Sequence, residues 1–553
     1  MAVQVVCTTL LIEKSPQALP LGAACIATAI KHSQELRGLC EVSLTAFCLE
    51  DKDFPKDKKS ASEYIADKLI EKTSECDKAI FCFSCFVWNV GILETAAKRL
   101  REKGFVCIAG GPEITAHPDF YKAFNYTVSG EGEITVPALI AKIIKEKGGV
   151  GVEKTDKVII SKSPELDSLY SPYLDGMINP SEYEGALWEL ARGCPFKCAY
   201  CYESKGEKTV RLFPMERIKA ELDLFARKKV PQVFVLDPTY NVNKKRAVEL
   251  LRLIASRTPD TFYYFEARAE FIDRELAREF TRIPCALQIG LQSANEEVLK
   301  LVNRPWDKKK FIRGIGILNE EGVTFGLDLI YGLPGESFGS FREGVDFAVS
   351  LLPNNLEIFN LSVLPGTELA DRADGLGLEY EKEPPYHVLK TKLLTSEDME
   401  RARKLAAACS YFYNSGRAVT WFGSVCRVLK IKSSKFFELF YQTNSKVCED
   451  NCSCECNHIE IEKVQLDFLK GLFTERNMVK YIRLVEDIVR FYGAISRTTD
   501  TGIGETLSLN YNAEYLASDY ASDIRWFYEN VKPQKCKIQT FMNNGSADFR
   551  FVK

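Results

Sequence analysis

Three cysteines stand close together in the run that ends at Cys201, at positions Cys194, Cys198 and Cys201. Their spacing, Cys-x3-Cys-x2-Cys, allows three thiolates to bind three corners of a cubane iron–sulfur cluster. A closed cluster site has four protein ligands, so the fourth iron would keep an open position for a substrate. The alternatives are a zinc knuckle and buried structural thiols. Zinc sites pair Cys-x2-Cys units with a further Cys or His, and no such pair lies nearby, so the spacing favours a catalytic cluster.

The bulk properties are those of a globular protein with several domains. The chain has 553 residues, of which 46% are hydrophobic and 27% charged, both ordinary values. The net charge of -3 gives nucleic-acid binding no electrostatic support. No apolar run reaches the roughly 18 residues that a membrane helix needs, and the N-terminus lacks the basic segment of a signal peptide. Nineteen cysteines in so long a chain fit a reducing, cytoplasmic compartment.

Apolar runs alternate with amphipathic stretches over residues 1 to about 150. This alternation predicts a parallel sheet covered by helices on both faces. The expected strands are Val3–Leu11, Val42–Leu49, Ala79–Val87 and Phe105–Gly110, and the expected helices are Leu21–Lys31, Tyr64–Thr73, Ile92–Lys103 and Val136–Lys147. Ligands of such sheets lie beyond the carboxyl ends of the strands.

The loops after these strands carry the informative residues. Ser84 follows one strand, the pair Gly110 and Gly111 precedes Pro112 after another, and Gly130 with Glu131 begins a Gly-Glu-Gly-Glu run. Paired glycines let a backbone approach a bulky ligand closely. Loops need glycine in any case, so these residues alone would also fit a Rossmann-like domain that binds a nucleotide or nothing.

A second strand–helix alternation begins near Leu187 and predicts a partial (β/α)6 barrel. The cysteine loop would follow its first strand, at the carboxyl end where barrel enzymes place their chemistry. The expected strands are Leu187–Arg192, Gln232–Leu236, Tyr263–Glu266, Ala286–Gly290, Thr324–Ile330 and Glu357–Val363. Each polar residue at a strand end could, singly, be a solvated loop charge.

The cysteine motif resembles the signature of the radical S-adenosylmethionine (radical SAM) enzymes. The order of Gly-Gly-Pro and Gly-Glu-Gly-Glu ahead of it resembles the cobalamin-binding domain that precedes many radical SAM cores. The resemblance covers residues 1 to about 395. It implies an α/β protein with a Rossmann-like cobalamin-binding domain at 1–150, a linker at 151–172, a TIM-like radical SAM barrel at 173–395 and a mainly helical accessory domain of uncharacterised role at 396–553.

The resemblance also assigns roles to individual residues. In this family the open iron of a [4Fe–4S] cluster binds SAM, and the reduced cluster cleaves SAM to a 5′-deoxyadenosyl radical. The carried-over assignments are Cys194, Cys198 and Cys201 for the cluster; Tyr200, Asp237, Glu266, Arg268 and Gln292 for SAM; and Ser84, Gly110, Gly111, Gly130 and Glu131 for cobalamin. Tyr200 would stack near the adenine, and Glu266 with Arg268 would bind the ribose and carboxylate.

The chain departs from classical cobalamin proteins in one respect. It lacks the Asp-x-His-x-x-Gly motif that supplies an imidazole to cobalt, and its four histidines are His32, His117, His387 and His458. We therefore expect cobalamin without a histidine beneath the cobalt.

The C-terminal third contains long amphipathic patterns, at Glu397–Gly416 and Val464–Tyr492, that predict helices. Between them lie five soft ligands, at Cys448, Cys452, Cys454, Cys456 and His458. They could hold zinc or an auxiliary cluster. Their alternate-residue spacing suits one metal poorly, so surface thiols are the default interpretation.

The leading hypothesis is a cobalamin-dependent methyltransferase that acts on an unactivated carbon or on phosphorus. The alternatives are a radical rearrangement or redox enzyme without methyl transfer, and a cobalamin- or SAM-binding sensor without turnover. Tyr386, set on a loop by two prolines, is the candidate for substrate contact at the barrel mouth, with packing at the barrel seam as its alternative. The substrate could be a small molecule, a lipid or a peptide, and a flavodoxin or ferredoxin would donate electrons.

Overall fold

The computed structural model describes residues 3–73, 78–146, 157–204, 209–450, 457–543 and 545–552. The chain forms two compact units. The first comprises Met1–Ala286, Ser362–Gly375 and Tyr380–His387, and the second comprises Leu287–Leu361, Leu376–Glu379 and Val388–Lys553. The division at residue 286 falls inside a strand of the predicted barrel, and the domain boundaries at 150, 172 and 395 stay predictions.

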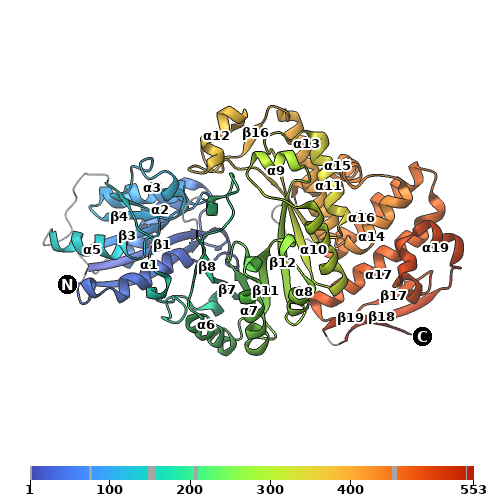
Figure 1. Ribbon diagram of the computed structural model, residues 1–553, viewed down its shortest axis with the longest axis horizontal. Helices are drawn as coiled ribbons and strands as arrows, with labels where there is room; N and C mark the ends of the chain where they lie inside the picture. The colour runs from blue at the N-terminus through green and yellow to red at the C-terminus, as the bar shows by residue number, and fades with distance from the viewer. Residues whose placement is uncertain are drawn as a thin grey trace. The chain divides into compact units, whose positions relative to one another are not determined.

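The first unit begins with a six-stranded parallel sheet, as the sequence predicts (Figure 1). Its order is β2-β1-β3-β4-β5-β6, so the direction of strand addition reverses between β1 and β3. Such a switch point opens a crevice beyond the carboxyl ends of the two strands. The strands are β1 (Val3–Leu11), β2 (Cys40–Cys48), β3 (Ala79–Ser84), β4 (Val106–Gly110), β5 (Tyr126–Ser129) and β6 (Lys157–Ile160).

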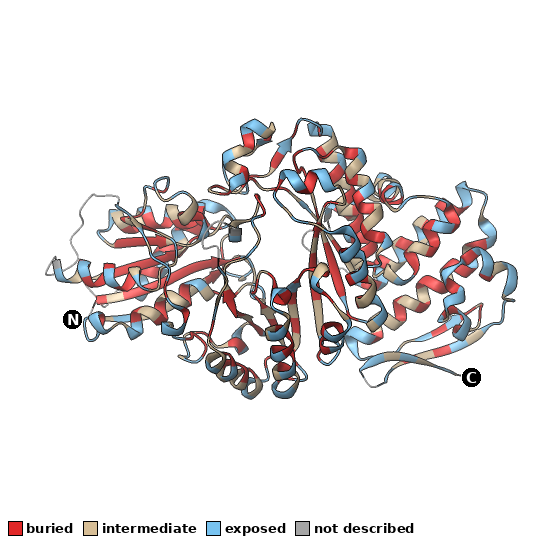
Figure 2. Ribbon diagram, in the orientation of Figure 1, coloured by how far each residue is buried: buried red, intermediate tan, exposed pale blue. Residues whose placement is uncertain are grey.

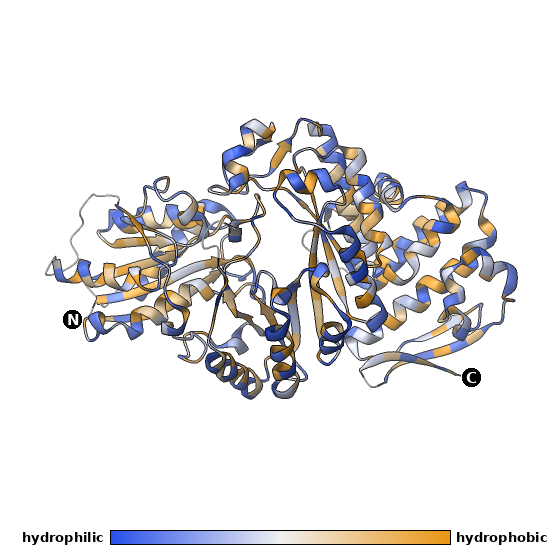
Figure 3. Ribbon diagram, in the orientation of Figure 1, coloured by the Kyte–Doolittle hydropathy of each residue, from blue (hydrophilic) through white to orange (hydrophobic). Residues whose placement is uncertain are grey.

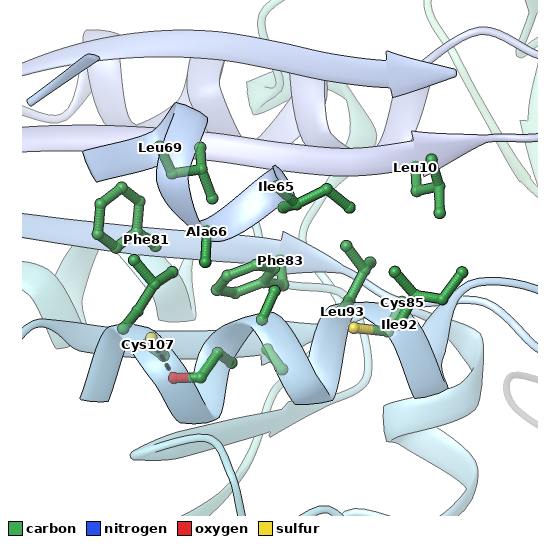
Figure 4. Packing of buried hydrophobic residues seen from close by; sticks show 14 of the residues in the cluster. Leu10, Ile65, Ala66, Leu69, Phe81, Phe83, Cys85, Ile92, Leu93 and Cys107 are labelled. Carbon is green, nitrogen blue, oxygen red and sulfur yellow. Dashed lines mark hydrogen bonds between the residues drawn. The ribbon is translucent and has the colours of Figure 1, made fainter. Parts of the chain in front are cut away.

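Helices cover both faces of this sheet, which explains its nearly continuous apolar strands. On one face α1 (Leu21–His32) packs with α5 (Thr135–Glu146) around Val5 and Cys7 of β1. The other face lies against α2 (Lys58–Lys72) and α3 (Val90–Glu102). Figure 4 shows Phe81 and Phe83 of β3 between side chains of these two helices, and Figures 2 and 3 show the strands as buried and apolar.

A second sheet contains the predicted barrel strands, in the order β14-β13-β12-β11-β10-β7. Buried and more accessible residues alternate along β11: its second, fourth and sixth residues are buried, its first and third are half-buried and its fifth is exposed. One face of each strand therefore packs under helices, and the other is accessible. The strands are β7 (Gly185–Trp188), β10 (Gln232–Val235), β11 (Phe262–Ala267), β12 (Cys285–Gln292), β13 (Phe325–Tyr331) and β14 (Asn355–Asn360), and the helices between them include α6 (Met215–Lys228), α7 (Lys244–Arg257), α10 (Lys308–Glu321) and α11 (Phe338–Ser350).

The first predicted barrel strand is shorter than expected. The strand β7 ends at Trp188, and β8 (Ala191–Arg192) pairs antiparallel with β9 (Arg211–Leu212) outside the barrel sheet. The physical reason is charge: Arg192 pairs with Glu131 and Glu133, which belong to the loop after β5. The resulting two-residue ribbon, β8–β9, closes the loop that carries the three cysteines.

The C-terminal region is mainly helical, as predicted, with a small antiparallel sheet that the sequence analysis did not anticipate. The predicted helix over Val464–Tyr492 is wrong in detail, because the chain breaks near Asn477, whose φ is 57°. Asn tolerates this left-handed conformation. The elements are α13 (Ser396–Cys409), a π-helical turn (Ser410–Ser415), α14 (Val419–Leu429), α15 (Ser433–Asp450), α16 (His458–Glu475), α17 (Ile482–Thr501), β17 (Thr506–Leu509), β18 (Cys536–Asn543) and β19 (Ser546–Phe551).

Candidate cofactor site

The three predicted cluster cysteines lie on one partly buried loop between β8 and β9. Cys198 is 6% exposed, and its carbonyl accepts a hydrogen bond from the Cys201 amide at 3.0 Å. Burial, together with the neighbouring thiols of Cys198 and Cys194, raises the pKa of Cys201 to about 11. Burial also raises the pKa of Cys194. The three thiols are thus close enough to interact electrostatically.

Over the part of the chain that the structure describes, no three His, Cys, Asp or Glu side chains are grouped so that they could hold one metal ion. A cubane cluster does not require such a grouping, because each thiolate binds a different iron. The assignment of the three cysteines to a cluster stays a prediction.

Arg268 packs against the cysteine loop. Its guanidinium lies 4.2 Å from the ring centroid of Phe196, between Cys194 and Cys198, and pairs with Glu270 at 2.9 Å. The amide of Asn241 holds the Arg268 backbone through two hydrogen bonds of 2.9 and 3.0 Å. Glu266, two residues earlier on β11, is exposed on the accessible face of the barrel strand. Both side chains thus lie in the first unit with the cysteines.

Two other predicted SAM contacts flank the same loop. Asp237 follows β10 and is buried, and this burial raises the pKa of its carboxyl despite a hydrogen bond from the Thr239 backbone. Tyr200 is half-buried, and the adjacent carbonyl of Ala199 accepts a hydrogen bond from the Leu369 amide at 2.8 Å. The loop is therefore anchored by the segment that follows the sixth strand.

Gln292, the remaining predicted SAM contact, lies in the second unit. It ends β12 at a shift in pairing register and has a φ of 69°, a left-handed conformation rare for a glutamine. Its buried Oε1 has no hydrogen-bond partner among the described residues. Strained residues with unsatisfied polar atoms are characteristic of functional sites.

The second unit also contains two carboxyls with little access to solvent, the half-buried Asp328 within β13 and the buried Glu336 after this strand. Asp328 accepts a hydrogen bond from Gln288, and burial raises the pKa of Asp328 to about 6. Glu336 is 1% exposed and accepts a hydrogen bond from Ser293 at 2.7 Å, and burial raises its pKa to about 8. The sequence analysis assigned neither residue a role.

The predicted close approach of Gly111 to a ligand has an explanation inside the protein. Gly111 has a φ of 102°, and a Cβ there would lie 2.5 Å from the carbonyl oxygen of Cys85. Gly130 has a φ of 98°, which also favours glycine. At Gly110 the nearest atom to a Cβ would be the Val128 oxygen at 3.7 Å, an ordinary contact. The backbone itself thus requires Gly111, and its role toward cobalamin stays a prediction.

An aromatic pair lies at the switch point of the N-terminal sheet. Phe86 and Trp88 follow β3 and stack with ring centroids 4.6 Å apart and planes 9° apart. Trp88 is 48% exposed. Ser84 ends the same strand, and its carbonyl accepts a hydrogen bond from the hydroxyl of Thr9 at 2.8 Å. An exposed flat apolar surface beside a crevice fits a macrocycle such as a corrin ring. The aromatic spacing, Phe-x-Trp after a strand, is the signal that could have identified this pair.

Both flanks of the cysteine loop contact carboxyl-end loops of the N-terminal sheet. Before the cysteines, Arg192 pairs with Glu131 at 2.5 Å and with Glu133 at 2.8 Å. After them, the hydroxyl of Tyr202 donates to the Pro112 carbonyl at 3.0 Å. The sequence analysis assigned Glu131 to cobalamin, whereas the structure pairs its carboxylate with arginines of the β8–β9 ribbon.

Tyr386 is buried and does not reach open space. Its hydroxyl donates to Glu113 at 2.5 Å, and the hydroxyl of Tyr121 donates to the same carboxylate oxygen at 2.6 Å. All three residues are 4% exposed. This contact matches the alternative interpretation, packing at a seam, and the predicted substrate role of Tyr386 stays untested.

The structure describes the surroundings of three histidines. His32 stacks on Tyr170 and bonds to Asp175 at 2.6 Å, His117 is exposed after the short helix α4 (Pro112–Ala116), and His458 contacts Arg497 in the second unit. In the cysteine-rich segment, Cys448 is buried, and Cys452, Cys454 and Cys456 lie outside the described residues.

Comparison with known families defines the class of the central region. Residues 188–348 match the model of the radical SAM superfamily. This match confirms the predicted radical SAM domain, with its [4Fe–4S] cluster and SAM. Residues 374–545 match a second model, described as a protein of unknown function (DUF4080).

Individual relatives extend the similarity to the cobalamin-dependent class. The chain is 27% identical over 351 residues to the cobalamin-dependent radical SAM methyltransferase TokK of Streptomyces tokunonensis, covering 55% of this chain and 49% of TokK. It is 27% identical over 350 residues to the 2-(S-pantetheinyl)-carbapenam-3-carboxylate methyltransferase of Streptantibioticus cattleyicolor, covering 55% and 50%. The chain thus spans about half the length of these curated relatives.

Solved structures share the fold. The cobalamin-dependent radical enzyme OxsB with aqua-cobalamin bound matches 96% of this chain and 85% of its own, with a TM-score of 0.56 and 15% identity. The methyltransferase TsrM from Kitasatospora setae matches 72% and 81%, with a TM-score of 0.52 and 16% identity. The resemblance to cobalamin-dependent radical SAM enzymes is therefore confirmed, and at these identities the solved structures support the fold alone.

Among the described helices, none is long and apolar enough to cross a membrane.

Proposed function

We propose that this protein is a cobalamin-dependent radical SAM methyltransferase acting on an unactivated carbon or on phosphorus. The observation that carries the proposal is the double attachment of the cysteine loop to the N-terminal sheet, through Arg192 before the cysteines and Tyr202 after them. The attachment keeps a cluster near the sheet edge at which a parallel α/β domain binds its ligand. A methyl transfer that needs two cofactors requires this proximity. The named activities of the relatives support the same conclusion.

The residues divide into three groups in this proposal. Bound cluster and cobalamin would supply, respectively, the electron that cleaves SAM and the methyl carrier. Arg268 and Glu266 would orient SAM beside the cysteine loop, with Asp237, Tyr200 and Gln292 as further contacts. The exposed Phe86–Trp88 pair, Ser84, Gly110 and Gly130 would form the cobalamin edge. Tyr386, predicted from the sequence to contact substrate, would act from its buried position through its bond to Glu113.

The proposed partners follow from the same chemistry. A small molecule, lipid or peptide would be the substrate, and a flavodoxin or ferredoxin the electron donor. None of the fifteen described cysteines forms a disulfide, which supports a reducing compartment such as the cytoplasm.

The test begins with anaerobically purified protein reconstituted with iron, sulfide and hydroxocobalamin. We expect about four irons per chain, as a cubane cluster requires, and one bound cobalamin. Replacing Cys194, Cys198 and Cys201 together by Ala should abolish the cluster and SAM cleavage while cobalamin still binds. Cys536→Ala, a change in the C-terminal sheet, is the matched control. A cluster retained in the triple variant would contradict the assignment of these ligands.

Substrate is then sought in extracts of a strain that lacks the gene, with SAM carrying a deuterated methyl group. A product that gains the labelled methyl supports methyl transfer. SAM cleavage with an isomerised and unlabelled product would instead indicate the rearrangement alternative. Binding of both cofactors without any SAM cleavage would indicate a sensor.

A further inference from the structure

The carboxylate of Glu131 contacts both strands of the β8–β9 ribbon that closes the cysteine loop. Arg192 and Arg211 are directly paired across the ribbon. One oxygen of Glu131 accepts from Arg192 at 2.5 Å, and the other accepts from Arg211. Glu131 therefore bridges both strands of the ribbon, and Arg211 also donates to the oxygen that Arg192 contacts, at 3.4 Å. Bidentate contacts of this type fix geometry as well as adding energy.

Glu131 itself belongs to the ligand edge of the N-terminal sheet. It follows Gly130, whose φ of 98° turns the chain sharply after β5. Glu133, two residues on, pairs with Arg192 at 2.8 Å. Only one residue, Gly130, separates the end of β5 from Glu131, so a ligand that displaces this loop must also displace the carboxylate.

The ion pairs are sheltered from solvent. The side chains of Arg192, Glu131 and Glu133 are 14%, 26% and 8% exposed. Pairs this sheltered are screened much less than surface pairs, and removal of one partner leaves a poorly solvated charge. Burial raises the pKa of Glu131, but hydrogen bonds from Arg211 and Arg192 outweigh it and hold the pKa below its usual value. Glu131 is thus ionised at neutral pH.

A cavity lies beside the ribbon at Arg192. This cavity, of about 130 Å³, borders Arg192 and Glu133 and is lined further by Cys25 and His32 of α1 and by Tyr170. The ribbon has only two residues in each strand. Such a short element follows the side chains that hold it, because its own backbone pairing is weak.

We propose that Glu131 is a positioning residue that couples the ligand edge of the N-terminal sheet to the cysteine loop. Binding of cobalamin at the edge and of SAM at the cluster would then be thermodynamically linked, each changing the affinity of the other by the same factor. This inference rests on the proposed function, because it takes cobalamin as the ligand of the edge. It reassigns Glu131 from direct cofactor contact to control of the loop.

The experiment measures hydroxocobalamin binding by absorbance to the full-length protein containing its cluster, with and without saturating SAM. For the wild type we expect SAM to change the dissociation constant by about fivefold or more, the lower end of typical coupling. The Glu131→Gln variant loses the charge that pairs with both arginines. In this variant, the factor by which SAM changes the dissociation constant of hydroxocobalamin should approach one. Both ligands should still bind, and the iron content should be normal. SAM binding measured with and without hydroxocobalamin must give the same factor.

Glu189→Gln is the matched control, because Glu189 pairs with Arg192 at 2.9 Å without joining it to the N-terminal loop. This variant should retain the coupling. If Glu131→Gln loses its cluster, Arg211→Gln tests the same bridge, since Arg192 then keeps Glu133 and Glu189. A purely structural role would change stability in these variants and leave the factor intact.

The outcomes separate the two proposals. Failure of the wild type to bind hydroxocobalamin would overturn the proposed function and this inference with it. Binding of both ligands with independent affinities, or full coupling in Glu131→Gln and Arg211→Gln, would overturn the inference alone.

Discussion

The two six-stranded parallel sheets differ in how they bury their strands. In the N-terminal sheet, eight of nine residues of β1 and five of six residues of β3 are buried. In the barrel sheet, β11 and β12 alternate between buried and accessible residues. The first sheet has helices on both faces, whereas barrel strands pack helices on one face and line the lumen with the other. A continuous apolar run therefore indicates a strand that is buried on both faces. An alternating run indicates a strand with one face toward the barrel lumen.

The accessible faces of the barrel strands carry aromatic and acidic side chains. In the first unit, Phe234 of β10 stacks on Tyr264 of β11 with centroids 4.1 Å apart, and Leu236 is 41% exposed. In the second unit, Asp328 and Glu357 are directly paired on neighbouring strands.

The largest expected effect is Phe81→Ala in the N-terminal sheet. Phe81 is fully buried and packs edge-on against Phe105, so its removal should cost about 3–5 kcal/mol in the free energy of unfolding. Phe234→Ala, on the accessible face of the barrel sheet, should cost about 1–2 kcal/mol. Urea unfolding under anaerobic conditions measures both. Equal losses would show that the two sheets are buried alike.

Substitutions at Gly111 and Gly110 distinguish the effect of backbone strain from the effect of a ligand that lies close to the backbone. Gly111→Ala should cost about 2–3 kcal/mol even without cobalamin, because of its positive φ and the Cys85 backbone. Gly110→Ala meets only an ordinary contact and should leave stability nearly unchanged. If Gly110→Ala loses hydroxocobalamin binding while remaining stable, the ligand approaches Gly110. A stable Gly111→Ala variant would contradict the strain argument.

Each unit contains a buried carboxyl, Glu113 in the first unit and Glu336 in the second. Glu336 has one donor, Ser293, whereas Glu113 has two phenols. Because the pKa of Glu336 is raised from 4.5 to about 8, the folded state holds its proton while the unfolded state releases it. Stability should therefore fall as pH rises between these values.

Glu336→Gln, which cannot ionise, should remove this dependence and exceed the wild type by about 1–2 kcal/mol near pH 8. Thermal unfolding between about pH 5 and 8 measures the difference. Parallel pH profiles for the two proteins would show that Glu336 is solvated.

The smallest expected effect on stability is Tyr386→Phe. It removes one of two hydrogen bonds to Glu113 and should cost about 1 kcal/mol. Uncoupled SAM cleavage, measured as 5′-deoxyadenosine, should be unchanged. Arg268→Ala should reduce cleavage with or without substrate, because Arg268 packs on the cysteine loop. Equal loss of cleavage in both variants, at normal iron content, would assign Tyr386 to the SAM site.

Most of the fold could be predicted because its signals are local. The boundaries of β1 and the start of α1 agree with the sequence prediction to the residue, since long apolar runs and periodic helices are encoded by their own composition. The predictions failed where a partner distant in sequence decides the outcome. The first barrel strand ends early because Arg192 pairs with Glu131, 61 residues away. The small C-terminal sheet forms from short strands that few local signals distinguish.

The residues of the site also divide into those that the sequence predicts and those whose roles depend on the tertiary structure. The sequence alone predicted the cluster ligands, because three thiolates within eight residues need no distant partner to indicate their chemistry. Only the tertiary structure decided that Glu131 bridges the β8–β9 ribbon, that Gly111 is required by the Cys85 backbone and that Tyr386 is buried against Glu113. Ligand type and spacing are properties of a short segment, whereas ion pairs, steric contacts and burial depend on which segments the folded chain brings together.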